Sequence, residues 1–261
     1  GLELASWYKL GPLFTPPVLG DINGPLGILM APAAAGGTNW PGGSLDPETG
    51  ILYVSSNSSL GALSLVPPYR GQSDMAYIQG SPITGPRTSG GAGSSAGGGR
   101  TEFQAQQRQA PVSTRGTPPR GILVDRLPLQ KPPYGKISAL DLRDGTLAWQ
   151  IAHGQTPDRV ANHPALASLD IPRTGQSASV GTLVTKTLLI AGEAEMTTGD
   201  EGERRAFLRA YNKSNGKEVG ALKLPAPQTG SPMTYMLDGE QYLVLAVSGS
   251  GYSGELLAFK L

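Results

Sequence analysis

An asparagine–tryptophan pair set among glycines is the feature of this sequence best suited to ligand chemistry. Asn39 and Trp40 lie in the stretch GGTNWPGG (36–43), where glycine and proline disfavour a helix. The amide can donate a hydrogen bond to a ligand oxygen, the indole offers one N–H donor and a flat face, and the glycines let backbone N–H groups approach an anion. The pair therefore predicts contact with a flat, oxygen-rimmed ligand. The alternative is that Trp40 packs between sheets and Asn39 serves the turn.

Two histidines and an aspartate fall in one segment, HGQTPDRVANH (153–163). Contact between substrate and His163 or Asp158 is one interpretation, because a loop that follows a strand repeat can line a binding mouth. The interpretation that the sequence favours is a solvated loop in which Asp158 makes a local turn. With only His153 and His163, and with no cysteine in the chain, a His-rich metal site, a Cys-based zinc site and disulfides are excluded.

Three further groups could do chemistry, and each has a simpler explanation. Glu193 and Glu195 share one face of an expected strand and could bind Ca²⁺ or act as an acid–base pair, but their acidic surroundings predict an exposed loop. The letters GSSAG (93–97) match a serine nucleophile motif, but the segment lacks the flanking strand and helix that the motif needs, so we reject it. Thr234 could have a functional role, and packing in a strand is favoured.

The composition limits the class of protein. The 261 residues carry a net charge of +1, with 16% charged residues and no basic stripe, so a nucleic-acid partner is not expected. No run of about 18 apolar residues exists, so no membrane span is expected, and the N-terminal residues lack the pattern of a signal peptide. Gly (37) and Pro (23) make up about a quarter of the chain, which favours a turn-rich all-β fold over a helical one.

The elements that must hold these residues are predicted to be short β-strands. The candidate strands are rich in β-branched and aromatic residues and are bounded by turn residues. They are 50–56, 135–142, 146–152, 181–192, 206–212, 217–224, 233–237, 241–249 and 255–261. Asp-Gly at 238–239 and 144–145 and Asn-Gly at 215–216 predict type I′ hairpins, because both turn residues tolerate positive φ.

One segment differs from the rest of the chain. Residues 85–121 are rich in Gly, Ser, Gln, Pro and Arg and contain little that could be buried. They are predicted to be a mobile, low-complexity surface insertion in a single domain that spans 1–261.

A short repeat indicates how the strands are organised. ALDLRDGTLAW (139–149) has the form Ala-x-Asp-x-x-x-Gly-x-x-x-Trp, AYNKSNGKEVG (210–220) repeats it without the Trp, SLDPETGILYV (44–54) is a third copy and Ala258 begins a fourth. The acidic or amide side chain is expected to accept N–H bonds in the turn, the Gly to take positive φ, and Trp149 to pack against the next unit. Without insertions the period is about 40 to 50 residues, which is typical of β-propeller blades. The prediction is an all-β fold of about four blades, each of four antiparallel strands.

Several segments resemble the quinoprotein dehydrogenases, eight-bladed propellers with tryptophan-docking repeats that bind pyrroloquinoline quinone (PQQ), and in particular their glucose dehydrogenase branch. These segments are GPLFTPP (11–17), NWPGGSLDPETGILYV (39–54), KPPYGKISALDL (131–142), LRAYNKSNGK (208–217) and LPAPQTGSPMTYMLDGEQYLVLAVSGSG (224–251). Their order and spacing resemble the C-terminal half of that branch. The family's catalytic carboxylate, its quinone-contacting Lys and its stacking Trp have no counterpart in this sequence.

The resemblance implies part of a periplasmic PQQ-dependent enzyme that oxidises a sugar or alcohol by hydride transfer to the quinone. It implies that Asn39 and Trp40 contact PQQ, that no catalytic residue lies in this chain, and that most ligands of the Ca²⁺ ion lie outside it. The missing N-terminal half, or a second chain, would be the partner that completes the propeller. The alternative function is a non-catalytic, propeller-like scaffold that binds no quinone.

Overall fold

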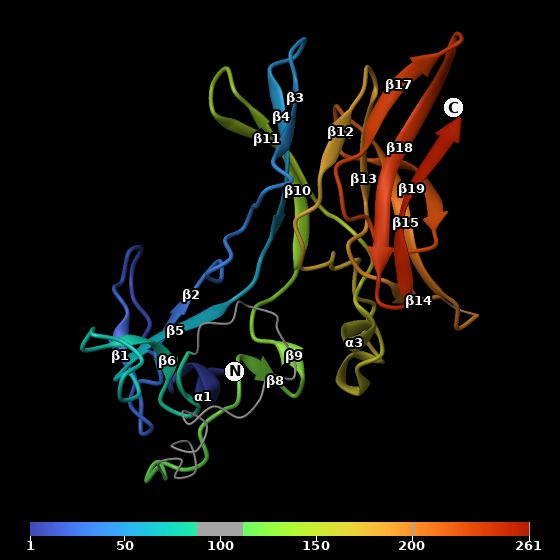
Figure 1. The fold of residues 1–261 in the computed structure, drawn as a ribbon. Coiled ribbons are helices and arrows are strands. Elements are labelled where there is room, and N and C mark those ends of the chain that lie inside the picture. The colour runs from blue at the N-terminus through green and yellow to red at the C-terminus, as the bar shows by residue number, and fades with distance from the viewer. Residues whose placement is uncertain (88–111, 200, 261) are drawn as a thin grey trace. The chain divides into compact units, whose positions relative to one another are not determined.

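The computed structural model describes residues 1–87, 112–199 and 201–260, and most of its regular structure is β-strand (Figure 1). By their internal contacts the residues form two compact units. Unit 1 comprises Gly1–Ala34 and Leu60–Leu129, and unit 2 comprises Ala35–Ser59 and Gln130–Leu261. The described helices are short: α1 (Leu2–Ala5), α3 (Asp158–Ala161) and the 3-10 turn η2 (Pro164–Leu166). In the described part of the chain, no helix is long and apolar enough to cross a membrane.

Unit 1 is built on one irregular sheet. Its strands are β1 (Val18–Leu19), β2 (Ile28–Met30), β5 (Gly61–Val66), β6 (Ile78–Ser81) and β7 (Gly85–Pro86), in the order β1-β5-β6-β7 with β2 also paired to β5. Only the β1–β5 pair is parallel among these pairs. A separate hairpin pairs β8 (Leu123–Val124) with β9 (Leu127–Pro128).

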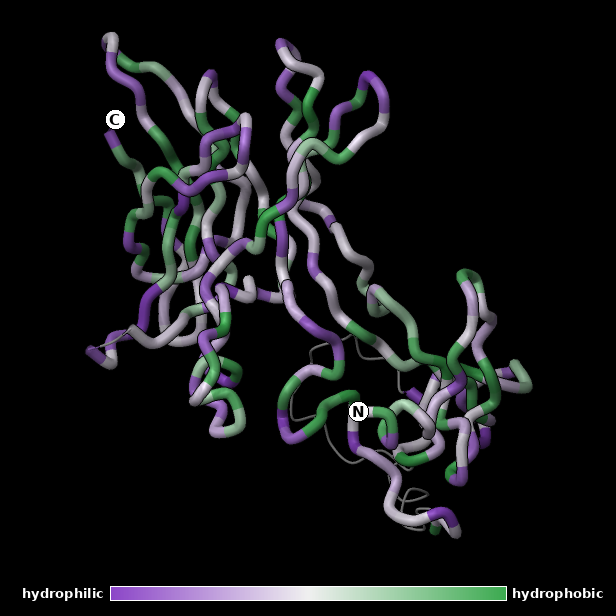
Figure 2. Tube along the Cα trace, turned by 180° about the vertical axis from the view of Figure 1, so that it is seen from behind, coloured by the Kyte–Doolittle hydropathy of each residue, from purple (hydrophilic) through white to green (hydrophobic). Residues whose placement is uncertain are grey.

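Unit 2 contains three antiparallel sheets. The first has the order β11-β10-β4-β3, with β3 (Gly43–Asp46), β4 (Ile51–Asn57), β10 (Gly135–Asp141) and β11 (Thr146–Ala152). The second contains β12 (Thr182–Val184), β13 (Leu188–Gly192), β15 (Arg204–Asn212) and β16 (Glu218–Leu224), with β14 (Thr197–Thr198) on β15. The third has the order β17-β18-β19, with β17 (Met233–Leu237), β18 (Glu240–Gly249) and β19 (Tyr252–Lys260). Hydrophilic residues gather in the turns at the strand ends (Figure 2).

The predicted all-β class and its antiparallel strands are confirmed. Eight of the nine predicted strands correspond to β4, β10, β11, β15, β16, β17, β18 and β19, with ends that differ by a few residues. The exception is 181–192, which forms the two strands β12 and β13. Thr185 closes the turn between them, because its N–H donates to the Leu188 carbonyl over 2.8 Å.

The turn predictions are confirmed at one position and wrong at two. Asp238 and Gly239 have φ values of 52° and 82°, as a type I′ hairpin requires. At 144–145 and 215–216 only the glycine has positive φ, and its N–H donates to a carbonyl four residues earlier. These turns are therefore longer than two residues. In each case the strand before the turn, β10 or β15, shows a register shift in its pairing with the strand after the turn.

In three of the four repeat copies, the turn has the geometry that the sequence predicts. The Gly216 N–H donates to the Asn212 carbonyl over 2.9 Å, and the Asn212 side chain accepts the Ser214 N–H over 2.9 Å. The copies that begin at Asp141 and Asp46 make the same two contacts. However, the Asp46 copy joins β3 to β4 and lies in the same sheet as the Asp141 copy. It is a reused turn and does not mark a further blade.

Apolar side chains fill the spaces between successive sheets of unit 2. The first and second sheets share a buried cluster that contains Tyr53, Ile137, Ala139, Val180, Leu189, Ala191 and Tyr211. The second and third sheets share another, which contains Ile190, Ala206, Leu208, Leu224, Ala226, Leu243, Leu245 and Val247. The second sheet therefore buries both of its faces, and alternate residues of β13 and β15 serve opposite clusters.

Trp149 of the first sheet docks on the repeat turn of the second sheet. Its indole N–H donates to the Lys213 carbonyl over 3.0 Å, and the Tyr53 hydroxyl donates to the same carbonyl over 3.0 Å. The ring lies on Gly216, where an added Cβ would stand 2.8 Å from the ring carbon Cε3. The glycine is thus needed both for its positive φ of 71° and for the space it leaves to the indole.

Replacing Gly216 with alanine is expected to lower the free energy of unfolding of unit 2 by about 2 kcal/mol, because the left-handed backbone and the indole both resist a Cβ. Gly145 is the matched control, since it has φ of 75° at the same repeat position and nothing within 4 Å of an added Cβ. Gly145→Ala should cost only about 1 kcal/mol. Urea unfolding followed by circular dichroism measures both, and equal losses would show that the docked ring contributes nothing.

Candidate functional site

The loop that carries Asn39 and Trp40 is held in place at the start of β3. The Gly37 carbonyl accepts hydrogen bonds from the Asn57 N–H (2.7 Å) and from the Ser179 hydroxyl (3.0 Å). Ser179 precedes the second sheet, so the loop is tied to both the first and the second sheet of unit 2. A further bond, from the Ser44 hydroxyl to the Thr182 carbonyl over 2.6 Å, joins β3 to β12 directly.

The two predicted ligand-contacting side chains are exposed on this anchored loop. The Asn39 Oδ1 accepts the Trp40 N–H over 2.8 Å, and the Asn39 carbonyl accepts the Gly42 N–H over 2.9 Å, so the backbone is fixed by a tight turn. The Asn39 amide Nδ2 makes no hydrogen bond to another described residue. Trp40 is 97% exposed, so the described residues do not cover its ring. The alternative in which Trp40 packs between sheets is therefore not what this structure shows.

His153 lies inside the protein between the first and second sheets. Its Nε2 lies 3.1 Å from the Gly192 carbonyl and its Nδ1 lies 2.9 Å from the Tyr211 hydroxyl. The carbonyl can only accept, so Nε2 carries the proton and Nδ1 accepts from the tyrosine. Burial lowers the pKa of His153 to about 4, although the hydrogen bond to the Gly192 carbonyl acts to raise it. The imidazole is therefore neutral at pH 7 and joins two sheets.

Stability should fall when the solution is acidified from about pH 6.5 to about pH 4. In this pH window His153 is protonated in the unfolded state but stays neutral in the folded state, because its pKa is lowered there. The unfolded state therefore binds more protons, and acidification favours it. Above pH 7 the histidine adds no pH dependence. Urea midpoints measured between pH 4 and pH 7.5 should fall less steeply for His153→Gln than for the unchanged chain. Parallel curves would contradict the assignment.

The segment 153–163 is not the solvated loop that the sequence favours. His163 is only 4% exposed, and its Nδ1 accepts the Ala165 N–H at the start of η2. Asp158 lies in α3, where its carboxylate accepts from the Thr198 N–H, the Thr198 hydroxyl and the Arg204 guanidinium. These contacts tie the segment to β14 and β15, so both residues have structural partners.

Glu193 is the largest departure from the prediction, because it was expected in an exposed acidic loop and is fully buried. Its Oε1 accepts from Arg209 Nη2 at 2.6 Å and Nε at 2.9 Å, and also from the Gln155 N–H at 2.8 Å. Its Oε2 accepts the Phe207 N–H. Burial raises the pKa of the carboxyl, and Arg209 opposes that rise. Glu195 contacts Gln176 through its backbone N–H and carbonyl.

Three buried polar side chains that stabilise the fold were not identified from the sequence: Arg209, Gln176 and Gln228. Arg209 also pairs with Glu218 over 2.8 Å, and it lies on the face of β15 that meets the first sheet. Gln228 accepts the Gly192 N–H and donates to the Gly181 carbonyl, and Gln176 accepts the Ala194 N–H. The one signal for Arg209 is a charged residue in the middle of the strand pattern AFLRAYN.

Residues 88–111 of the predicted low-complexity insertion (85–121) lie outside the described residues, and its C-terminal end contacts other parts of unit 1. Arg115 donates to the Ser6 carbonyl over 3.1 Å and lies over the Trp7 ring at 4.4 Å, and the Thr114 N–H donates to Asn23. The motif GSSAG (93–97) lies outside the described residues.

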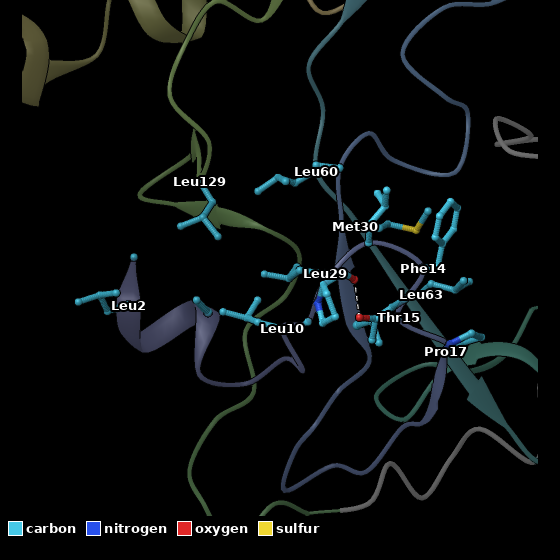
Figure 3. A pocket seen from close by; sticks show the side chains of 17 residues that line it. Leu2, Leu10, Phe14, Thr15, Pro17, Leu29, Met30, Leu60, Leu63 and Leu129 are labelled. Carbon is cyan, nitrogen blue, oxygen red and sulfur yellow. Dashed lines mark hydrogen bonds between the residues drawn. The ribbon is translucent and has the colours of Figure 1, made fainter.

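A separate cavity of about 850 Å³ lies in unit 1 (Figure 3). Its labelled lining residues are almost all apolar, and they include Leu2, Leu10, Phe14, Leu29, Leu63 and Leu129. Thr15 also lines the cavity, and its hydroxyl donates a hydrogen bond to the Pro12 carbonyl over 2.6 Å. No charged side chain lines the cavity among the described residues, so it offers neither an acid–base group nor a metal ligand.

Comparison with known proteins gives the family. The family model for the β-propeller domain of PQQ-dependent glucose, ethanol and alcohol dehydrogenases matches residues 2–243. The chain belongs to this family. The β-propeller class predicted from the repeats is thereby confirmed, and so is the resemblance to quinoproteins. The three antiparallel sheets of unit 2, which have four, five and three strands, are the part of the chain in which that architecture is most regular.

Curated relatives in the family differ in the substrates that their names give. The quinoprotein glucose dehydrogenase of Escherichia coli (strain K12) is 29% identical over 93% of this chain and 26% of its own length. The probable quinate dehydrogenase (quinone) of Xanthomonas campestris pv. juglandis is 28% identical over 86% and 25%. The glycerol dehydrogenase large subunit of Gluconobacter thailandicus is 28% identical over 90% and 28%. The chain spans about a quarter of the length of these relatives.

Proposed function

We propose that this chain is part of a PQQ-dependent dehydrogenase and that the Asn39–Trp40 loop forms one wall of its quinone site. The observation that carries the proposal is the exposed indole of Trp40 on a loop that two sheets hold in place. A large aromatic ring that is exposed to water contributes little to the stability of the fold. A flat ligand that stacks on it would bury its apolar surface. Membership of the PQQ-dependent family names the ligand.

The residues present fit one side of such a quinone. The indole face can cover a flat ring system, and the Asn39 Nδ2 is a donor without a partner among the described residues. When bound, PQQ supplies the electrophilic carbonyl that takes up hydride from a carbinol carbon. The part that the family resemblance assigns to this chain is to bind and orient the cofactor. The names of the relatives, glucose, quinate and glycerol dehydrogenases, support a sugar or alcohol hydroxyl as the substrate group.

The Ca²⁺ ion that the family resemblance implies has no matching site among these residues. No cluster of three or more His, Asp or Glu side chains is placed to hold a metal in the described part of the chain. We therefore assign no step to calcium here. On the family resemblance we also propose that the enzyme is periplasmic. The same resemblance supports further polypeptide, beyond these residues, that completes the propeller ring.

The proposal is tested by titrating the purified chain with PQQ and following tryptophan fluorescence. Saturable quenching that depends on Trp40 is the expected result, because Trp7 is buried and Trp149 is docked on Gly216. Quenching that is the same with and without the Trp40 ring would contradict the proposed role of this loop, and an absence of saturable quenching would favour the non-catalytic scaffold.

A further inference from the structure

Two hydrogen bonds to the second sheet and the segment before it enclose residues 37–44, which we call the ligand loop. At the start of the loop, the Gly37 carbonyl accepts the Ser179 hydroxyl over 3.0 Å. At its end, the Ser44 hydroxyl donates to the Thr182 carbonyl over 2.6 Å. Both bonds join distant parts of the chain, and the loop spans the distance between them.

Glycines on either side of Asn39 and Trp40 make the loop dependent on these attachments. Gly36 has a φ of 82° and Gly42 a φ of 66°. A glycine backbone has wide conformational freedom unless other contacts restrict it. Inside the loop, the Asn39 side chain accepts the Trp40 N–H and the Asn39 carbonyl accepts the Gly42 N–H. These bonds fix the local shape of the turn, whereas its position on the sheets depends on the bonds at its two ends.

The Gly37 carbonyl is held from two directions. Asn57 of β4 donates its backbone N–H over 2.7 Å, and Ser179 donates its hydroxyl from a position 142 residues further along the chain than Gly37. A carbonyl oxygen has two acceptor sites, so both bonds can form together. The bond from Asn57 belongs to the backbone of the first sheet. The bond from Ser179 depends on a side chain, so a single substitution can remove it.

The backbone that carries Ser179 is itself fixed. The next residue, Val180, is 5% exposed and belongs to the buried cluster between the first and second sheets. Its N–H donates to the hydroxyl of the buried Ser55 in β4 over 3.2 Å. Ser179 is therefore held at the junction of the two sheets, and its hydroxyl can hold the ligand loop against that junction.

We propose that Ser179 is a positioning residue of the quinone site, which holds the ligand loop where Asn39 and Trp40 can meet the cofactor. The inference rests on the proposed function for the identity of the ligand. A loop that is already fixed in its binding position loses less conformational entropy when the ligand binds, so its affinity is higher. Because the hydroxyl lies outside the sheet that carries the loop, the position of Trp40 depends on how the first and second sheets pack.

A spin label on the loop tests the positioning without any ligand. The chain has no cysteine, so Thr38→Cys gives a unique attachment site on an exposed residue of the loop. In electron paramagnetic resonance, adding Ser179→Ala should shift the label to a more mobile spectrum, because Gly37 loses one of its two bonds. Ser179→Thr keeps a hydroxyl and should restore the restricted spectrum.

Ser138→Ala is the matched control. Ser138 is also half-buried, and its hydroxyl accepts from the Gln150 side chain over 2.7 Å within the first sheet, without contacting the loop. Both alanine variants lose one hydrogen bond, so both should lower the melting temperature by a similar small amount. Only Ser179→Ala should mobilise the label.

Titration with PQQ, on chains without the label, gives the second measurement. Ser179→Ala should raise the dissociation constant about tenfold, whereas Ser179→Thr and Ser138→Ala should leave it close to that of the unchanged chain. In the Trp40→Ala background the effect of Ser179→Ala should shrink, because the hydroxyl acts through the loop that carries the ring.

An unchanged label spectrum in Ser179→Ala overturns the proposal, and so does equal mobilisation of the label by Ser138→Ala. A mobile loop whose PQQ affinity is unchanged also overturns it. If the unchanged chain does not bind PQQ, the proposed function fails, while the label still decides whether Ser179 holds the loop.

Discussion

Replacing Arg209 with methionine is expected to lower the free energy of unfolding of unit 2 by about 3 to 5 kcal/mol. Arg209 is 2% exposed and holds the fully buried Glu193 through two of its nitrogens. Methionine fills much of the same space but leaves that carboxylate with only the Gln155 and Phe207 N–H groups. An ionised group inside a protein without its counter-ion is far costlier than an exposed one. Urea unfolding followed by circular dichroism measures the loss.

Two comparisons separate the buried charge from other effects of the substitution. Arg204→Met removes the more exposed ion pair with Asp158 and should cost less than about 1 kcal/mol. Adding Glu193→Gln to Arg209→Met removes the buried negative charge and should recover a substantial part of the loss. If Arg209→Met and Arg204→Met cost the same, Glu193 does not depend on Arg209 for its stability in the interior.

Replacing Trp40 with alanine is expected to weaken PQQ binding by about 30-fold, or about 2 kcal/mol, with no change in the melting temperature. The two halves of this expectation have one cause, the exposure of the ring. A side chain that the described residues leave uncovered contributes little to folding and can give its whole face to a ligand. Isothermal titration with PQQ and differential scanning calorimetry measure the two quantities on the same sample.

Trp149→Phe is the matched control for the tryptophan. Trp149 is docked on Gly216 and donates to the Lys213 carbonyl, so its replacement should lower the melting temperature and leave PQQ affinity unchanged. The opposite pattern, with Trp40→Ala destabilising the fold while sparing quinone binding, would show that Trp40 packs against protein in solution.

Local sequence rules account for the strands and turns of unit 2. Short runs rich in β-branched and aromatic residues and bounded by turn residues mark β10, β11, β17 and β18. The Asp-Gly pair at 238–239 sets a type I′ turn, since both residues tolerate positive φ. The repeat around Trp149 is also local, because its turn is closed by hydrogen bonds within five residues. The same rules miss the break in 181–192, where the polar turn is only a few residues long.

The burial of charged and polar side chains was decided by tertiary contacts. Glu193 and His163 belong to segments that look solvated in sequence, and both are buried. The partner of Glu193 is Arg209, 16 residues away on the neighbouring strand, and no local pattern pairs them. A carboxylate is stable in the interior only when such a partner arrives from elsewhere in the chain. Its exposure therefore cannot be inferred from its neighbours in sequence.

Sequence by itself determined the all-β class, the repeat and the choice of Asn39 and Trp40 as ligand-binding candidates, because strand pairing patterns and turn chemistry act over a few residues. Tertiary structure decided that Trp40 is exposed on an anchored loop and that His153 is held neutral between two sheets. The physical reason is that exposure depends on which distant segments cover a side chain, and a residue's own type does not specify them.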